Sequence, residues 1–212
     1  MIKTFASYHH KNDQAYKEKL TNWAVGAGLI EDYSVSTGDI DENQDSQSIR
    51  RTIRDYYLRD SEVTVLLCGA ETRFRKHVDW ELKSTMIDGK YNKRSGILVI
   101  NLPESESTCW HTCYPDEKNI VYPDCVNWFS VKSYLEYEER YPNMPRRILQ
   151  NLNKGDVKIS VAPWDKVYGN EIAFSYLLRH AADSGPRNPY DTSRPMRKKN
   201  YNPRTDYLDV RT

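Results

Sequence analysis

The sequence predicts an α/β fold in which helices cover both faces of a five-stranded, mainly parallel sheet. Two continuous apolar runs, Val63–Cys68 and Ile97–Ile100, are typical of strands that are buried on both faces. An amphipathic helix from about Arg75 to Asp88 separates them, so the chain repeats a strand–helix–strand unit. Right-handed crossovers between such units build a doubly wound sheet, and we expect the flavodoxin-like strand order 2-1-3-4-5.

The beginning of the chain follows the same alternation. Ile2–Ser7 reads as a first strand, and Asn12 or Asp13 is expected to cap the helix that follows it. That helix carries apolar side chains at helical spacing and stops near Gly26 and Gly28, and Leu29 and Ile30 begin a short second strand. A polar, acid-rich loop over 34–45 and a second helix from Ser46 are expected to come next.

The second half of the domain is less regular in sequence. We expect one domain over 1–183, within which 102–162 is rich in insertions and contains a fifth strand that the pattern does not locate. Residues 144–152 are compatible with a helix, and 170–182 predict a firmer one. On that last helix, Ile172, Tyr176, Leu177 and His180 fall on one side.

The last 29 residues, 184–212, differ in composition from the rest. They contain four prolines, seven basic residues and three acidic ones, and they offer few apolar groups to bury. This composition predicts a mobile tail that the fold does not need. A nucleic-acid-binding arm is a weaker alternative, because three aspartates dilute the positive charge.

The overall composition excludes several classes of protein. The formal net charge is +1, from 31 basic and 30 acidic residues, so a general affinity for polyanions is not indicated. No apolar stretch approaches the roughly 20 residues that a membrane-spanning helix requires. The four cysteines form no disulfide framework, and we therefore expect a cytoplasmic protein.

A ligand site is expected where the strand order reverses, beyond the carboxyl ends of the first and third strands. The loops that reach this crevice are Ser7–Lys11 and Gly69–Arg73. The second loop leads into a helix N-terminus, whose free backbone N–H groups favour phosphate, and Arg75 and Lys76 add positive charge. The pattern is compatible with a bound nucleotide diphosphate, although charged residues at such a place are as often solvated surface.

The helix after the third strand carries two acids on opposite borders of its apolar stripe. Val78, Leu82, Thr85 and Met86 form the stripe. Asp79 is expected to pair with Lys83, four residues later on the same helix. Glu81 has no basic residue at the corresponding positions, and spacing alone cannot distinguish a solvated acid from a functional one.

Three segments together resemble a known family. Phe5–Asp13, with its Ser-Tyr-His, is similar to the opening strand and loop of TIR domains, and Val63–Thr72 is similar to their third strand and turn. Arg75–Leu82 contains the aromatic-Glu-aliphatic core of the family's helix. Their order and spacing over about residues 1–101 resemble the TIR-like proteins of Thoeris anti-phage defence. The loop over 34–43 lacks the proline-containing signature of animal and plant TIR domains, so assembly modes of those domains cannot be transferred.

The resemblance implies an enzyme that cleaves NAD and makes a cyclic ADP-ribose-type messenger for a separate effector. Glu81 matches the family's catalytic glutamate. The resemblance also implies contacts with NAD, as substrate rather than cofactor, for Ser7, Tyr8, His9, Asp39, Asn43, Gly69, Ala70 and Trp80. A homo-oligomer is compatible with this assignment, and neither a membrane nor a nucleic acid is expected as a partner. The alternative is a TIR-like interaction module without turnover.

The sequence disfavours three other kinds of site. Cys109, His111, Cys113 and Cys125 could in principle hold zinc, but three residues instead of two separate the first two thiols. The chain contains no Gly-rich phosphate loop and no GxGxxG. A phosphoreceiver would need acids where Ser7 and Cys68 stand.

Overall fold

In the computed structural model, the described residues are 1–34, 52, 55, 58–89 and 92–201. Their strands form one sheet in the order β2-β1-β3-β4-β5, and every neighbouring pair is parallel. The strands are β1 (Ile2–Ser7), β2 (Ile30–Asp32), β3 (Val63–Cys68), β4 (Gly96–Asn101) and β5 (Ile159–Pro163). The predicted α/β, flavodoxin-like fold and its strand order are confirmed.

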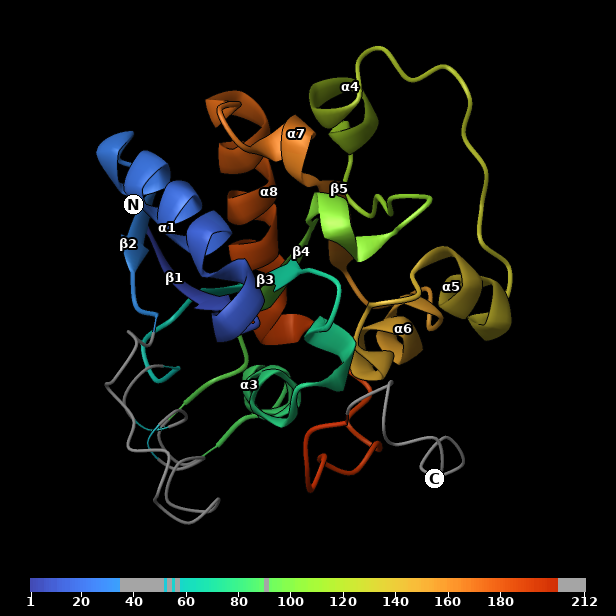
Figure 1. Cartoon of the computed structure of the whole chain (residues 1–212). Helices are drawn as coiled ribbons and strands as arrows, with labels where there is room; N and C mark the ends of the chain where they lie inside the picture. Colours follow the sequence, from blue (N-terminus) through green and yellow to red (C-terminus); the bar gives the residue numbers. More distant parts are fainter. Residues whose placement is uncertain (35–51, 53–54, 56–57, 90–91, 202–212) are drawn as a thin grey trace.

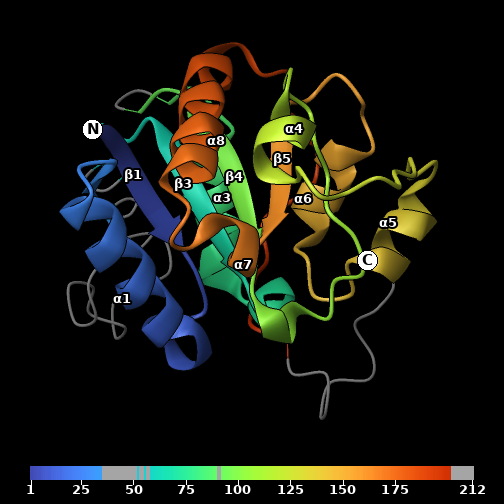
Figure 2. The ribbon, with the colours of Figure 1, turned by 90° about the horizontal axis from the view of Figure 1, so that it is seen from above.

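Helices cover both faces of the sheet, as Figures 1 and 2 show. One face carries α1 (His10–Gly26), α7 (Trp164–Val167) and α8 (Glu171–Ser184), and the other carries α3 (Lys76–Thr85), α5 (Tyr134–Arg140) and α6 (Arg146–Leu152). The remaining short elements are η2 (Thr72–Phe74), η3 (Pro103–Ser105), α4 (Glu117–Val121) and η4 (Gly185–Arg187).

Two apolar layers hold the helices to the sheet. Alternate side chains of β3 point to opposite faces, so Val65 and Leu67 pack under α1 and α8 while Leu66 packs under α3 and α6. All six residues of β3 and of β4 are buried, which explains their uninterrupted apolar sequence. The stripe predicted on α3 faces this core: Val78, Leu82, Thr85 and Met86 are all buried.

Two helix predictions need correction. Helix α1 begins at His10 with His9 as its N-cap, so the two expected caps, Asn12 and Asp13, lie inside its first turn, and their N–H groups donate to the His9 carbonyl. On α8, the inward face contains Phe174 and Leu177, whereas Ile172 is 76% exposed, so the stripe was assigned about one residue out of place. The helix expected from Ser46 falls mostly outside the described residues.

Residues 185–201, which follow α8, pack against the domain although their composition predicts a free tail; we call them the docked segment, and 202–212 lie outside the described residues. The Asn188 amide exchanges two hydrogen bonds with the backbone of Lys158, ahead of β5. The buried Tyr190 donates its hydroxyl to the Ser95 carbonyl. Further along, Asp191 and Asn151 exchange two hydrogen bonds. Polar contacts therefore hold this segment on the domain, although its composition predicted a mobile tail.

Within the described part of the chain, no helix combines the length and the apolar character that crossing a bilayer requires.

Candidate functional site at the carboxyl ends of β1 and β3

Ser7 and Glu81, which lie 74 positions apart in the sequence, are in direct contact. Ser7 is the last residue of β1, and its hydroxyl donates a 2.6 Å hydrogen bond to Glu81 Oε2 on α3. Both side chains are buried, with Glu81 only 4% exposed. The contact brings together the first and third segments of the family resemblance at one end of the sheet.

The surroundings of Glu81 disfavour its charged form. Burial raises the pKa of the Glu81 carboxyl to about 8, although the hydrogen bond from Ser7 acts in the opposite direction. A carboxyl whose pKa lies near neutrality is common at reactive sites, because desolvation both raises the pKa and strengthens electrostatic interactions. The solvated role that spacing alone allowed for Glu81 is therefore excluded.

Tyr8 and His9 follow directly in the loop after β1. The Tyr8 hydroxyl donates to Gln14 Oε1 at 2.6 Å, and the ring stacks on His10 with 4.4 Å between centroids. His9 caps α1, and its buried Nδ1 accepts or donates no hydrogen bond among the described residues. Burial, together with the positive charge of Arg75, lowers the pKa of His9 to about 4, so the imidazole is neutral at physiological pH.

The loop after β3 lies against the loop after β1. The Gly69 N–H donates to Thr72 Oγ1 at 2.8 Å, and Thr72 contacts the buried Asp13 carboxylate from α1. A Cβ on Gly69 would lie 2.5 Å from Asp13 Oδ1, so any larger residue here would force the buried Asp13 carboxylate to move. Ala70 follows Gly69 and is exposed at the same edge.

Several backbone N–H groups that were expected to bind phosphate around the N-terminus of α3 are already bonded within the protein. The N–H of Arg73 donates to the Asn143 carbonyl, that of Arg75 to the Thr72 carbonyl, and that of Lys76 to Asn200 Oδ1. Since Asn143 and Asn200 are distant in the sequence, local sequence patterns do not reveal these contacts.

Trp80 binds the docked segment. Its indole Nε1–H donates to the Arg197 carbonyl at 2.8 Å, and its ring stacks on His77. The Trp80 indole N–H, which was predicted to contact NAD, is therefore bonded to the docked segment. The remaining two predicted contacts, Asp39 and Asn43, lie outside the described residues.

Asp79 does not pair with Lys83. Its carboxylate accepts two hydrogen bonds from the guanidinium of Arg147 on α6, at 3.0 and 3.2 Å, and a third from the Arg197 N–H. The Lys83 ammonium instead donates to the Thr192 carbonyl. Since Arg147 lies 68 positions from Asp79, helical spacing could not have identified it.

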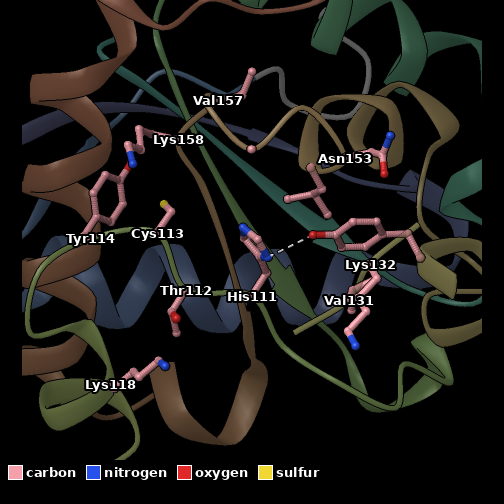
Figure 3. A pocket seen from close by; sticks show the side chains of 13 residues that line it. His111, Thr112, Cys113, Tyr114, Lys118, Val131, Lys132, Asn153, Val157 and Lys158 are labelled. Atoms are coloured by element: carbon pink, nitrogen blue, oxygen red, sulfur yellow. Dashed lines mark hydrogen bonds between the residues drawn. The ribbon is translucent and has the colours of Figure 1, made fainter. Parts of the chain in front are cut away.

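The segment that could have held zinc contributes to a separate pocket, shown in Figure 3. His111 pairs with Val161 of β5 through the backbone, and its Nδ1 lies 3.4 Å from the Tyr137 hydroxyl. Cys113 Sγ lies 3.4 Å from Ser160 Oγ. Burial lowers the pKa of His111 to about 4 and raises that of Cys113 to about 12, so both groups are neutral. No group of three metal-binding side chains occurs among the described residues.

Comparison with known proteins agrees with the geometry. Residues 5–107 match the family model of the Thoeris protein ThsB, TIR-like domain. No curated protein matches the chain. The matched range contains both members of the Ser7–Glu81 contact and the loop after β3. Residues 5–107 are therefore similar to the TIR-like domain of the Thoeris protein ThsB, and this similarity supports a role in anti-phage defence.

Proposed function

We propose that this protein cleaves NAD between nicotinamide and ribose and joins the remaining ADP-ribose into a cyclic messenger that acts on a separate effector. The observation that supports this most directly is the buried hydrogen bond from Ser7 to Glu81 at the carboxyl end of β1. This contact holds one buried carboxyl, with a raised pKa, near the carboxyl ends of β1 and β3, the edge where parallel sheets of this topology bind ligands.

One carboxylate is sufficient for this reaction. Nicotinamide is bound to the ribose as a cation and leaves as a neutral molecule, so no general acid is needed, unlike in ordinary glycoside hydrolysis. Positive charge then develops on the ribose, and the Glu81 carboxylate can stabilise it while it accepts hydrogen bonds from the ribose hydroxyls. The Ser7 hydroxyl holds one carboxylate oxygen in place.

The charge state of Glu81 couples to substrate binding. A pKa of about 8 leaves much of the carboxyl protonated at neutral pH in the free protein. The cationic nicotinamide ring favours the charged form, as an opposite charge lowers the pKa of an acid. The substrate itself would thus generate the carboxylate that opposes the developing charge. Exclusion of water from the bound sugar would favour its capture by a hydroxyl of the same molecule, which then gives up its proton, over hydrolysis.

The proposal is tested by incubating the full chain with NAD and measuring nicotinamide and the nucleotide products by mass spectrometry. Because such an enzyme can require activation, the same products are measured in extracts of phage-infected cells that express the protein. We expect Glu81→Gln to reduce product formation by about 100- to 1000-fold, the usual effect of removing a preorganised electrostatic partner.

Glu117→Gln is the matched control for this experiment. Glu117 is also buried and also accepts a serine hydroxyl, that of Ser160, but it lies near β5. It should retain turnover, and melting curves of both variants report whether they fold. If Glu81→Gln forms product like the parent, Glu81 is not the catalytic residue, and the interaction-module function becomes the better proposal.

A further inference from the structure

A second site lies on the opposite flank of α3 from Glu81. A cleft of about 620 Å³ lies here between the start of α3, the start of α6 and residues 194–201 of the docked segment. We name it the arginine cleft after its lining residues, which include Arg73, Arg146, Arg194 and Arg197. Asp79, which contributes to its wall, is two positions before Glu81 and therefore about 200° around the helix from it.

The arginine cleft concentrates positive charge in a protein whose net charge is +1. Eight of its fourteen lining residues are arginine or lysine, and a single one, Asp79, is acidic. That acid is already bound by Arg147, whose side chain is fully buried. The whole chain is nearly neutral, so the positive charge is concentrated at the cleft and does not reflect a generally basic protein.

Nearby acids compensate only part of this charge. Glu138 is shared between Arg73 and Arg146, and Glu71 pairs with Arg75. Among the described residues, Arg194, Arg197 and Lys198 form no ion pair. The docked segment thus adds cations to a wall that already carries them.

Arg197 is the centre of this arrangement. Its backbone is fixed on α3, because its N–H donates to Asp79 and its carbonyl accepts from Trp80. Burial lowers the pKa of its half-buried guanidinium, Asp79 opposes this shift, and the nearby charges of Arg146, Arg73 and Arg194 lower the pKa further. Placing like charges together in a partly desolvated cleft is unfavourable unless an anion balances them.

We propose that the arginine cleft binds the phosphate groups of a small anion, either a nucleotide or inorganic polyphosphate. Arginine forms bidentate hydrogen bonds with phosphate oxygens, and several guanidiniums on fixed backbone can surround successive phosphates. The volume falls within the roughly 300–1,000 Å³ of small-molecule sites. This site is distinct from the Glu81 site and does not depend on NAD turnover.

The test is isothermal titration calorimetry of the full chain with inorganic triphosphate and with ATP, in about 0.1 M salt, where the Debye length is about 10 Å. We expect saturable binding of both probes. The Arg194→Gln/Arg197→Gln double variant, which keeps the backbone contacts, should bind about tenfold more weakly or worse, through loss of charge-assisted hydrogen bonds. Arg179→Gln, an exposed site on α8, is the matched control and should bind like the parent.

The probes distinguish the source of the phosphate. Equal affinity for triphosphate and ATP means that the phosphate chain alone is recognised, and tighter binding of ATP means that the nucleoside also contributes. If the double variant fails to fold, Lys198→Gln removes an exposed cation of the same cleft. The proposal is overturned by absence of saturable binding, by parent-like binding of the cleft variants, or by binding of a single-stranded oligonucleotide without binding of either small probe.

Discussion

Asp79 and Glu81 lie on opposite flanks of α3 and have different surroundings. Asp79 and Glu81 are 6% and 4% exposed, so burial alone does not distinguish them. Asp79 faces Arg147 and the docked segment, which supply a bidentate guanidinium and a backbone N–H. Glu81 faces β1, which supplies one neutral hydroxyl. The Asp79 carboxylate is compensated by a cation, whereas Glu81 has no cation beside it, so burial favours its protonated form.

This difference separates a structural acid from a candidate catalytic one. A cation and hydrogen bonds offset the cost of desolvating a buried carboxylate, whereas an unmatched buried carboxylate keeps that cost. Buried carboxyl groups without a cation are found most often at functional sites, where a shifted pKa serves binding or catalysis. Substitutions on the Asp79 flank should therefore change mainly stability, and those on the Glu81 flank mainly pH dependence and activity.

The largest effect is expected from removing the cation on the Asp79 flank. Arg147→Met leaves the Asp79 carboxylate buried beside an apolar side chain, which should cost about 3–5 kcal/mol of unfolding free energy. Urea denaturation measures this loss. The matched control is Arg146→Met, whose partner Glu138 is partly exposed, and which should cost about 1 kcal/mol or less. Equal losses in the two variants would mean that the Asp79 pair is not the structural centre of this flank.

The next effect concerns the charge on the Glu81 flank and depends on pH. The carboxyl titrates at about 8 in the folded protein and at about 4.5 when unfolded, so the folded state holds the proton across this window. The parent should therefore lose stability as the pH rises from 5 towards 8, whereas Glu81→Gln does not titrate. The melting temperature of Glu81→Gln minus that of the parent should grow over this range. A constant difference would contradict the raised pKa.

The docked segment is expected to matter for stability, contrary to its composition. Truncation after Ser184 removes the carbonyls of Arg194 and Pro195 that accept from Arg147, and also the buried Tyr190. At about 1 kcal/mol per hydrogen bond, the melting temperature should fall by about 5 °C or more. Truncation after Tyr201 is the control and should have a smaller effect. An unchanged melting temperature in the shorter chain would restore the sequence-based view of a dispensable tail.

Sequence patterns predicted the parts of this molecule that repeat locally. The apolar runs Val63–Cys68 and Ile97–Ile100 are visible because every residue of a strand covered on both faces is buried. Glu81 was singled out by the family resemblance, since helical spacing left its role open. Asp79 was assigned the wrong partner because Arg147 is remote in sequence.

The docked segment and the arginine cleft were missed for a related reason. The prediction of a free tail relied on the small number of apolar side chains in it. The docked segment is instead held by hydrogen bonds to backbone groups and to side-chain amides such as those of Asn151 and Asn188. The cleft draws its cations from three separate stretches, around Arg73, Arg146 and Arg194, and no one stretch reveals it. Sites assembled by tertiary structure from polar groups leave no periodic signal.

The smallest of these effects concerns the hydroxyl that holds Glu81. Ser7→Ala removes a 2.6 Å hydrogen bond to the carboxylate but leaves its charge, so NAD cleavage should slow by about tenfold rather than be abolished. Because this hydrogen bond lowers the pKa of Glu81, its loss should also move the rise of kcat/KM to higher pH. Ser160→Ala removes the equivalent contact to the buried Glu117 and should change stability without changing the pH profile. If Ser7→Ala and Ser160→Ala gave the same pH profile, Ser7 would be a packing residue, and the two flanks of α3 would differ less than their geometry indicates.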